Sequence, residues 1–571
     1  MENAKKLYDI WMSQDLNDKD LIDDLQKIKG NESEIYERFY KNLDFGTAGL
    51  RGVLGAGTNR MNVYTVGQST QGLCDYLNSH YKSPKVAIAY DSRIKADVFS
   101  ILSAGIFAAN GITAYIYREL MPTPMLSFAV RELGCDAGIN VTASHNPAEY
   151  NGYKVYDGSG TQIGPEVADE VKANIEKIDI FSGVKQMDFE KGISEGKIIY
   201  IGDDIIESFY SKTLEQQVHN DAAEKAGLKL VYTPLNGTGN KPVREIFRRI
   251  GLTDVNIVKE QELPDGNFPT CPYPNPEIKE ALALGIKLAL EENADLLLAT
   301  DPDCDRVGIA VNDGTEMQLV SGNEIGVMLL DYICAGRKDN GTMPTKPVAV
   351  KSIVSSDLAT KVAESYGVEM RNVLTGFKFI GEQIYNLESA GEVDRFVFAF
   401  EESYGYLSGS HVRDKDAVSG SMLIAEMASY YKLKGKTLLE VMDDIYKTYG
   451  YFISKTVSHE FKGSSGMEKM DQIMNGLRSD CPKKIGDVNI VSVQDFQNQT
   501  ETFADGNVEK LDIHKSNVLK FTLEDGNNFI VRPSGTEPKI KVYFTSIDKS
   551  KDKAIEGYNK LMKNVNALLG F

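Results

Sequence analysis

Short apolar runs recur along the chain, and each is followed by a polar loop and then by a segment with helix-like spacing. The six clearest are KVAIAYDSR (85–93), AGINVTASHNP (137–147), LKLVYTPLNGTG (228–239), DLLLATDPDCDR (295–306), PVAVKSIVSSD (347–357) and RFVFAFEESYGY (395–406). Strands that alternate with helices are typical of α/β domains with parallel or mixed sheets. Ligands of such sheets bind beyond the carboxyl ends of the strands, where these polar loops emerge.

The pattern changes in the last part of the chain. The segments KTVSHEF (455–461) and NVLKFTLEDGNNFIVRPSGTEPKIKVYFTS (517–546) precede a helix-like stretch at 552–571. This order predicts an antiparallel sheet with helices packed against it. We therefore expect three related α/β domains with mixed or parallel sheets and a C-terminal α+β domain, arranged around a central cleft. The predicted domains are 1–205, 206–318, 319–447 and 448–571.

The composition of the chain excludes some kinds of binding partner and indicates a cellular compartment. The 571 residues include 63 Lys and Arg against 82 Asp and Glu, a net charge of −19, so neither nucleic acid nor an anionic membrane is an expected partner. The first twenty residues contain no signal-peptide core and no stretch is long enough to span a bilayer, which predicts a cytoplasmic protein. The six cysteines are scattered without a C-x-x-C spacing, so we expect reduced structural thiols.

The segment VTASHNP (141–147) places Ser144 beside His145 in a turn closed by Pro147. One interpretation is a hydrogen-bonded turn without further function. A serine hydrolase is disfavoured because the nucleophile elbow of α/β-hydrolases needs G-x-S-x-G, whereas residues 142–146 read TASHN. Since successive side chains of an extended chain alternate faces, we expect His145 to point away from Ser144 and to contact a ligand.

Three carboxylates at alternate positions, Asp301, Asp303 and Asp305, directly follow the apolar run LLLAT. They are either solvated loop acids or the ligands of a hard divalent cation that offsets their repulsion, and we favour the cation. An EF-hand is excluded, because its sixth and twelfth loop positions are Arg306 and Asn312 here. Three protein oxygens leave room for a phosphate oxygen, as Mg²⁺ sites usually do.

Two further segments suit an anion. RPSGTEPKIKVY (532–543) combines Arg532 with a Ser-Gly-Thr turn and with Lys539 and Lys541, although an ordinary hairpin turn would also explain it. FGTAGLRG (45–52) joins glycine-rich backbone to Arg51.

A charged segment, FEESYGYLSGSHVRDKD (400–416), suits a phosphorylated sugar. Its acidic end offers Glu401, Glu402 and Ser403 to sugar hydroxyls, and its basic end offers a phosphate the side chains of His411, Arg413 and Lys415. The alternative is a solvated charged loop.

In this order, TASHNP, DPDCDR, EESYG and RPSGTEPK resemble the loops of the α-D-phosphohexomutase family, the phosphoglucomutases and phosphomannomutases, over essentially the whole chain. The resemblance implies an isomerase that works as an intramolecular phosphotransferase in carbohydrate metabolism, as a monomer or homodimer. The N-terminal lead and FGTAGLRG are similar to the branch that includes phosphopentomutases and glucose-1,6-bisphosphate synthases. The metal loop departs from many relatives by carrying Pro302 and Cys304 in place of glycine.

The resemblance also assigns roles to residues. Ser144 is the implied phosphoserine and, with the three aspartates, a ligand of one Mg²⁺ per chain. Further implied catalytic residues are Arg51, His145, Lys154 and Lys415, of which either lysine is a general acid or base if burial lowers its pKa, or else acts on phosphate by charge alone. The implied substrate-binding residues are Arg306, Thr375, Lys378, Glu401, Ser403, His411, Arg413, Arg532, Ser534, Gly535, Thr536 and Lys541.

The function implied is reversible conversion of α-D-glucose 1-phosphate to glucose 6-phosphate through a 1,6-bisphosphate intermediate, which would also be the activator. Alternatives from the same family are a phosphopentomutase, a phosphomannomutase and a glucose-1,6-bisphosphate synthase. A non-catalytic phosphosugar-binding protein would have lost the serine, an aspartate or the anion loop, and all three are present.

Overall fold

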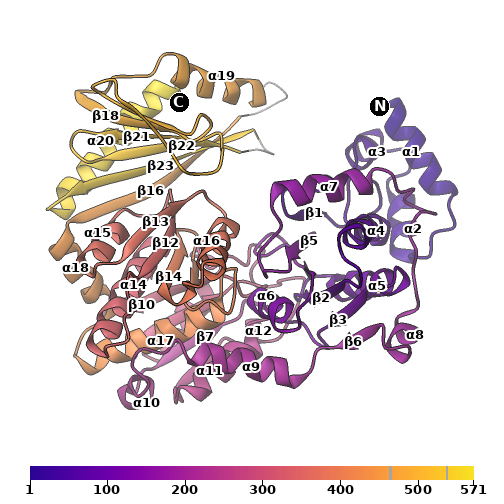
Figure 1. The fold of residues 1–571 in the computed structure, drawn as a ribbon, viewed down its shortest axis with the longest axis horizontal. Helices are drawn as coiled ribbons and strands as arrows, with labels where there is room; N and C mark the ends of the chain where they lie inside the picture. Colours follow the sequence, from indigo (N-terminus) through magenta and orange to yellow (C-terminus); the bar gives the residue numbers. More distant parts are fainter. Residues whose placement is uncertain (462–465, 535–537) are drawn as a thin grey trace. The chain divides into compact units, whose positions relative to one another are not determined.

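The computed structural model describes residues 1–461, 466–534 and 538–571. The chain forms two compact units, and each is described by itself. Unit 1 comprises residues 1–322, 380–399 and 403–437, and unit 2 comprises residues 323–379, 400–402 and 438–571. Figure 1 shows the chain coloured from its N-terminus to its C-terminus.

Unit 1 begins with three short helices, α1 (Glu2–Ser13), α2 (Lys19–Lys27) and α3 (Glu32–Phe39). Trp11 is 1% exposed and makes edge-on contacts with the rings of Phe39, Tyr64 and Phe181. These helices are not among the predicted elements, although Ala4, Tyr8 and Trp11 recur at helical spacing and are all buried.

The first sheet has the strand order β1-β5-β4-β2-β3-β6. Its strands are β1 (Gly49–Val53), β2 (Lys85–Tyr90), β3 (Thr113–Ile116), β4 (Ala137–Val141), β5 (Tyr150–Asp157) and β6 (Ile198–Tyr200). Strand β2 is parallel to β3 and β4, whereas β5 is antiparallel to both β4 and β1. The helices of this part are α4 (Val63–His80), α5 (Ala96–Ala109), α6 (Thr123–Glu132), α7 (Pro165–Ile175), α8 (Phe189–Ser194) and α9 (Asp203–Leu214).

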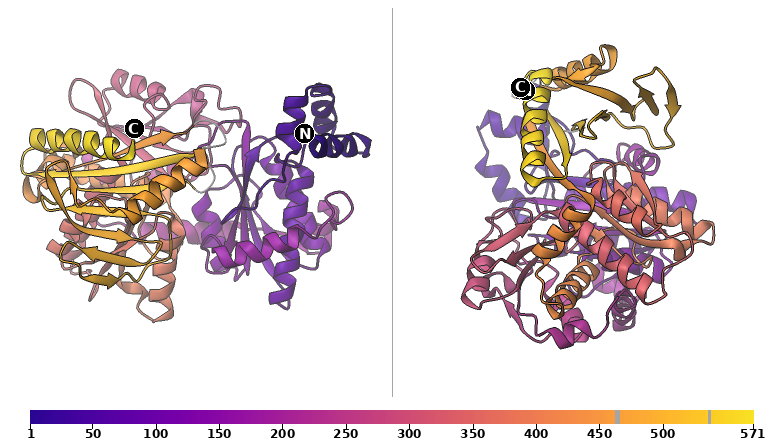
Figure 2. Two further views of the ribbon diagram at one scale, coloured as in Figure 1. Left: turned by 90° about the horizontal axis from the view of Figure 1, so that it is seen from above. Right: turned by 90° about the vertical axis from the view of Figure 1, so that its left-hand side faces the viewer.

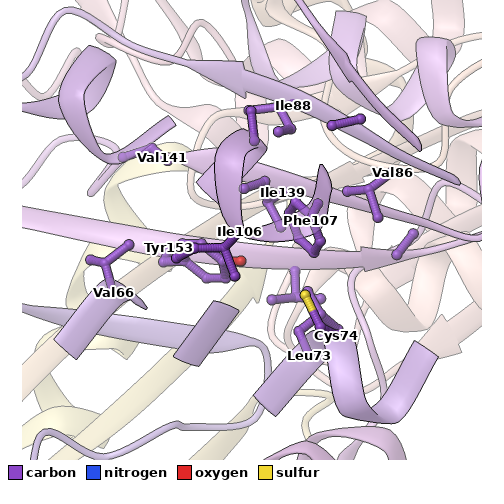
Figure 3. Close-up of a cluster of buried hydrophobic side chains, with 14 of the residues drawn as sticks. Val66, Leu73, Cys74, Val86, Ile88, Ile106, Phe107, Ile139, Val141 and Tyr153 are labelled. Carbon is purple, nitrogen blue, oxygen red and sulfur yellow. The ribbon is translucent and has the colours of Figure 1, made fainter. Parts of the chain in front are cut away.

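The core of this domain explains why its strands read as continuous apolar runs. Every residue of β4 is buried, because helices α5 and α6 both pack against it. Figure 3 shows part of the cluster, in which Ile88 and Ile139 from the sheet lie near Ile106 and Phe107 of α5.

The second sheet, also in unit 1, has the order β11-β10-β9-β7-β8. Its strands are β7 (Leu230–Thr233), β8 (Val255–Ile257), β9 (Leu296–Thr300), β10 (Val307–Asn312) and β11 (Met317–Val320). Strands β7, β8 and β9 are parallel, and β10 returns antiparallel to β9. The helices here are α10 (Ala222–Ala226), α11 (Asn240–Arg249), α12 (Lys259–Glu262) and α13 (Ala283–Glu291).

The third sheet has the order β13-β12-β14-β15. Its strands are β12 (Val348–Ser352), β13 (Glu369–Val373), β14 (Phe396–Glu401) and β15 (Gly405–Leu407), and β12 is parallel to β13. The helices of this region are α14 (Gly322–Asp339), α15 (Leu358–Ser365), α16 (Phe377–Ser389), the short 3₁₀ helix Val393–Arg395, α17 (Ala417–Leu433) and α18 (Leu438–Tyr449).

The C-terminal part of unit 2 is an antiparallel sheet of order β16-β23-β22-β21-β18-β19-β20, with β17 paired to β18. Its strands are β16 (Tyr451–Glu460), β17 (Lys484–Ile485), β18 (Val488–Asp495), β19 (Thr500–Phe503), β20 (Val508–Lys510), β21 (Leu519–Leu523), β22 (Asn528–Pro533) and β23 (Lys539–Asp548). The helices are α19 (Gly466–Ser479) and α20 (Lys551–Leu569), and α20 runs along the sheet over β23 (Figure 2).

Three α/β sheets followed by an antiparallel α+β region confirm the predicted fold class. The predicted boundaries after residues 205, 318 and 447 stay predictions. All six cysteines are free, as expected. Within the described ranges, none of the helices has the length and apolar character needed to cross a membrane.

Candidate active site

Ser144 lies in the connection between β4 and its antiparallel neighbour β5. Its φ of 51° is in the left-handed region, which residues other than glycine seldom occupy. The Ser144 amide donates to Thr142 Oγ1 at 2.8 Å, and the Asn146 amide donates to the Ala143 carbonyl at 3.1 Å. The hydrogen-bonded turn expected from the sequence is therefore present, and it holds the serine in a conformation that needs support.

The Ser144 hydroxyl faces both the aspartate loop and its own neighbour. Its Oγ donates to Asp301 Oδ2 at 2.8 Å and lies 3.1 Å from His145 Nδ1. The expectation that His145 points away from Ser144 is wrong, because the left-handed backbone at Ser144 removes the alternation of an extended chain. Burial, with the Arg306 and Arg51 guanidinium groups, lowers the pKa of His145 to about 2, so the ring is neutral.

The three aspartates occupy the connection between β9 and its antiparallel neighbour β10. Asp301 and Asp303 are 0% exposed and Asp305 is 2% exposed, so the alternative of solvated loop acids is wrong. One carboxylate oxygen from each lies within 4.8 Å of the others. Cys304, between the second and third aspartates, has a φ of 50° and places its amide on the Asp301 carbonyl at 2.9 Å, which folds the loop back on itself.

This donor set fits a hard divalent cation. The Oδ1 atoms of Asp303 and Asp305 are buried and accept no hydrogen bond from the described residues, a costly state without a partner. Burial raises the pKa of Asp301 well above its usual value, and the two neighbouring carboxylates add to the rise. Burial acts in the same sense on Asp303, but the Lys154 ammonium at 2.8 Å outweighs it and lowers the pKa of Asp303. A cation bound by oxygens would relieve both the repulsion and the unsatisfied atoms.

Four basic side chains surround these carboxylates and supply the local positive charge that an acidic protein needs to bind an anion. Lys154 Nζ lies 3.6 Å from Asp305 Oδ2, and Lys415 Nζ lies 3.5 Å from the same atom. Burial alone would lower the pKa of Lys154, but Asp303 and Asp305 raise it above its ordinary value, which favours the alternative that Lys154 acts by charge alone. The other two cations are Arg306, whose Nε lies 3.9 Å from Asp305 Oδ1, and Arg51, which donates to Asn146 Oδ1 at 3.4 Å.

Unit 2 contains Glu401, at the end of β14, and Thr375, before α16. Glu401 is 5% exposed and accepts a 2.7 Å hydrogen bond from the amide of Gly376, whose φ is 122°. Thr375 Oγ1 is buried and has no hydrogen-bond partner among the residues described. Lys378 lies on the first turn of α16 over the ring of Phe379, and burial lowers its pKa. Ser403, which belongs to unit 1, is partly buried in the β14–β15 connection.

The predicted anion loop follows β22. Arg532 donates to the Tyr543 hydroxyl at 3.3 Å, and the Ser534 amide donates to the Lys539 carbonyl at 2.8 Å. Lys541 pairs through its backbone with Arg532, and its side chain is exposed. Gly535 and Thr536 lie outside the described residues.

His411 and Arg413 are placed among protein groups of unit 1. The His411 ring packs edge-on to Phe128 and tilted against Phe209, and burial lowers its pKa to about 3. Arg413 is fully buried, and its Nη2 lies 2.9 Å from a carboxylate oxygen of Glu388. This placement favours packing, and contact of these residues with substrate remains a prediction.

Several residues that support the site are absent from the sequence prediction. These residues form hydrogen bonds or ion pairs around Ser144, Asp303, Arg306 and Lys415. They are Asp91, Arg93, Thr123, Glu277 and Asp414. A signal exists for the first pair, because DSR (91–93) directly follows a predicted strand. For Thr123 and Glu277 the deciding contact joins distant segments, as in the 2.8 Å bond from Arg306 to Glu277. Asp414 is the immediate neighbour of Lys415 in the sequence, so its contact is local.

Comparison with family models covers most of the chain. The models of phosphoglucomutase/phosphomannomutase α/β/α domains I, II and III match residues 42–180, 208–314 and 321–449, and the model of the C-terminal domain matches residues 481–557. The chain belongs to the phosphoglucomutase/phosphomannomutase family. This confirms the resemblance inferred from the four loops, and with it an enzyme of the phosphohexomutase class.

Curated relatives of this mutase family match the chain nearly end to end. A phosphoglucomutase of Staphylococcus saprophyticus is 37% identical over 539 residues, which are 94% of this chain and 96% of that protein. A phosphoglucomutase of Staphylococcus aureus (strain MRSA252) is 37% identical over 519 residues, 90% of this chain and 91% of the relative.

Solved structures of the family share the fold at lower identity. Parafusin, a phosphoglucomutase of Paramecium, gives a TM-score of 0.70 at 19% identity, with 93% of this chain and 95% of that chain covered. A phosphoglucomutase/phosphomannomutase family protein of Burkholderia thailandensis gives a TM-score of 0.64 at 18% identity, with 92% and 97% covered.

Proposed function

We propose that this chain is a phosphoglucomutase, which interconverts α-D-glucose 1-phosphate and glucose 6-phosphate through a phosphoserine at position 144. The observation that carries the proposal is the 2.8 Å contact between Ser144 Oγ and Asp301, inside a buried triad of aspartates. The phosphoglucomutases of the two Staphylococcus species, 37% identical over nearly the whole chain, support glucose as the sugar.

The chemistry is two phosphoryl transfers in opposite directions. A hydroxyl oxygen of the sugar phosphate attacks the phosphorus on Ser144, the bond from phosphorus to Ser144 Oγ breaks, and its electron pair stays on Oγ. The hydroxyl proton leaves to a base, and the product is glucose 1,6-bisphosphate. After the bisphosphate reorients, Ser144 Oγ attacks the phosphorus of the other phosphate. The bond from that phosphorus to its sugar oxygen breaks, the electron pair stays on the sugar oxygen, and this oxygen takes up the proton held by the base. The mutase product is then released from the rephosphorylated enzyme. Such transfers depend mainly on placement and on charge neutralisation.

The metal proposed here is one Mg²⁺ per chain, held by Asp301, Asp303, Asp305 and an oxygen on Ser144. When bound, it supplies charge neutralisation at the transferred group. The activator proposed is glucose 1,6-bisphosphate, because it can rephosphorylate a serine that has lost its phosphate.

Side chains of the protein also neutralise the negative charge of the transferred phosphoryl group. We assign Arg51 and Arg306 to the phosphoryl oxygens, and the neutral His145 ring to a hydrogen bond with them. Lys154 and Lys415 both lie near Asp305 Oδ2. Because the pKa of Lys154 is raised, we assign Lys154 to the phosphate by charge, and Lys415 is the candidate for the proton transfer.

Recognition of the sugar and of its non-reacting phosphate is assigned to the remaining loops. The sugar hydroxyls shared by both phosphate isomers would donate hydrogen bonds to Glu401, and would donate to or accept from the hydroxyl groups of Ser403 and Thr375. The fixed phosphate would be bound by Arg532, Ser534, Gly535 and Thr536, with Lys378 and Lys541 as further contacts. The buried Thr375 Oγ1, unpaired within the described chain, supports a ligand hydroxyl as its partner.

A coupled assay tests the proposal. The purified protein, with Mg²⁺ and a trace of glucose 1,6-bisphosphate, receives α-glucose 1-phosphate, mannose 1-phosphate or ribose 1-phosphate. We expect glucose 1-phosphate to give the highest kcat/KM, and Ser144→Ala to lower kcat by at least about 10³-fold. The control is Ser100→Ala, which removes a buried hydroxyl whose hydrogen bond in the described part of the chain is to the Ala96 carbonyl of the same helix, α5. A preference for ribose phosphate would replace the assigned substrate by a pentose, and full activity in Ser144→Ala would refute the mechanism.

A further inference from the structure

In each of the three α/β sheets, the predicted functional residues lie in the connection between two consecutive strands. Ser144 lies between β4 and β5, the aspartates lie between β9 and β10, and Glu401 and Glu402 lead from β14 towards β15. Each connection contains one non-glycine residue with positive φ, namely Ser144 at 51°, Cys304 at 50° and Tyr404 at 63°. Three strained turns at equivalent positions require equivalent support.

In each sheet the support comes from the loop after the first parallel strand. After β2, Arg93 binds the Ser144 connection. After β7, Thr238 donates to the Pro302 carbonyl from both its amide, at 2.8 Å, and its hydroxyl, at 2.9 Å. After β12, Ser355 Oγ accepts the Glu402 amide at 3.0 Å and lies 3.3 Å from Glu402 Oε2.

The Arg93 interaction is the most extensive of the three. Its guanidinium donates to four backbone carbonyls of one turn: Pro147 at 2.8 Å, Tyr150 at 2.9 Å, Ser144 at 2.6 Å, and Asn146. The Arg93 side chain is 0% exposed. A planar fork of five N–H groups can satisfy four carbonyls at once, which the single ammonium of lysine cannot do.

Two further contacts fix Arg93 itself. Its Nε lies 3.4 Å from Asp91 Oδ2, which accepts the Thr142 hydroxyl at 2.5 Å, and that hydroxyl in turn accepts the Ser144 amide. The guanidinium also lies over the ring of Phe268, 5.2 Å from its centroid, in a segment that precedes the metal loop. Arg93 therefore joins the serine connection to a second segment of unit 1.

The close packing of that second segment is shown by Gly266. A Cβ there would lie 2.5 Å from the Ile94 nitrogen and 2.7 Å from the Ser92 carbonyl oxygen. The backbone around Gly266 is thus pressed against the turn that carries Arg93, so the guanidinium has little freedom to move.

We propose that Arg93 is the positioning residue of the Ser144 connection, and that Thr238 and Ser355 do the same for the metal and sugar connections. None of the three is assigned contact with the reacting atoms. Arg93 acts by holding the carbonyls of residues 144–150, so that Ser144 Oγ stays aligned with Asp301. The inference rests on the proposed function for its kinetic consequences, but not for its structural ones.

The first experiment compares Arg93→Lys with the wild type and with the control Arg131→Lys, whose partners are Ser159 and Glu388. Hydrogen exchange of peptides covering residues 142–152 is expected to accelerate by at least about tenfold in Arg93→Lys and to stay unchanged in the control. Unchanged exchange in Arg93→Lys would overturn the inference whether or not the chain turns over a sugar phosphate.

The second measurement is kinetic. In Arg93→Lys we expect kcat to fall by about 10²-fold while KM changes by less than about threefold, because misplacement of the nucleophile affects the transition state most. Equal kcat in the variant and the wild type would overturn the inference and leave the proposed function intact. An inactive wild type would instead refute the proposed function, and the exchange result would still decide the role of Arg93.

A milder variant covers the case in which Arg93→Lys does not fold. Thr142→Val removes the hydroxyl that links Asp91 to the Ser144 amide, and Thr142→Ser restores it. We expect kcat to fall by about tenfold in Thr142→Val and to recover to within about threefold in Thr142→Ser. Equal loss in both variants would indicate packing alone and contradict positioning.

The other two connections give different readouts. Thr238→Val is expected to weaken Mg²⁺ binding, measured by calorimetry on the chain alone, by about tenfold. Ser355→Ala is expected to raise KM for the sugar phosphate by about tenfold with little change in kcat. Unchanged Mg²⁺ affinity and unchanged KM would restrict positioning to Arg93 and refute the general rule.

Discussion

Ser144, Cys304 and Tyr404 show how single residues store strain where the chemistry is expected. A non-glycine residue in the left-handed region costs about 1–3 kcal/mol and persists only where neighbours over-determine it. At Ser144 those neighbours are Thr142 and Arg93. In this conformation the Ser144 hydroxyl donates to Asp301 Oδ2 at 2.8 Å.

A pH-dependent contribution to stability is expected from Asp416, the N-cap of α17. Its carboxylate accepts amide hydrogen bonds from Val418 and Ser419, but burial raises its pKa from 3.8 to about 6. Between these values the unfolded chain loses the proton first, so a rise in pH favours unfolding. The shift amounts to about 3 kcal/mol, lost as pH rises from about 4 to 6 and still absent above that range.

Urea unfolding of the wild type and Asp416→Asn at pH 4.5 and 7.5 measures this contribution. The wild type should lose more stability than the variant between the two values, by about 2 kcal/mol, because part of the contribution is already lost at pH 4.5. The control is Asp487→Asn, whose carboxylate side chain is 96% exposed, and which should behave as the wild type. Identical pH dependence in Asp416→Asn and the wild type would show that the carboxylate is not stabilised in its protonated form.

At the scale of elements, helix α4 depends on a cap that also organises the loop before it. Asn62 Oδ1 accepts the amides of Tyr64 and Thr65, while its Nδ2 donates to the carbonyls of Gly55 and Gly57. One buried side chain thus starts an 18-residue helix and closes the turn that follows β1, the strand that carries Arg51.

Asn62→Ala is therefore expected to lower the free energy of unfolding by about 2 kcal/mol or more, since it removes a cap and leaves buried carbonyls unpaired. Asn78→Ala is the matched control, because the Asn78 side chain is exposed and, among the residues described, makes one hydrogen bond, to the Asn110 carbonyl. Urea midpoints measure the difference, and an equal cost for the two substitutions would contradict the role of the cap.

The sequence predicts the functional loops, but not the residues that hold these loops in place. The loops that contain Ser144, the aspartates and Glu401 are recognisable, because each places polar residues directly after an apolar run. The support from Arg93 is not, because its acceptors begin 51 residues further along and depend on how β2 and β4 pair. The orientation of His145 was mispredicted for a local reason, the backbone conformation of Ser144, which no residue pattern signals.

At the scale of the whole molecule, a chain with a net charge of −19 builds a positively charged site by local concentration of cations. Lys154, Lys415, Arg306 and Arg51 all belong to unit 1, as do the three aspartates. The aspartates are buried, and two of their oxygens accept no hydrogen bond within the described ranges, so without a cation they oppose folding. Binding of a cation to the folded chain should therefore stabilise it.

The expected result is that Mg²⁺ at about 100 times its Kd raises the free energy of unfolding by about 2.7 kcal/mol, and that a chelator reverses the effect. Asp301→Asn should respond much less, whereas Asp313→Asn, in the exposed turn between β10 and β11, should respond as the wild type. Thermal unfolding with and without Mg²⁺ measures both. An equal response of wild type and Asp301→Asn would place the stabilising cation elsewhere.

The central claim is that Ser144 carries the phosphoryl group, and peptide mass spectrometry tests it most directly. The protein is incubated with glucose 1,6-bisphosphate and Mg²⁺, desalted, and divided, and one half receives excess glucose 1-phosphate. We predict one phosphate on the peptide that contains Ser144, and its transfer to the sugar in the second half. A chain that turns over glucose 1-phosphate while this peptide stays unmodified would contradict the account.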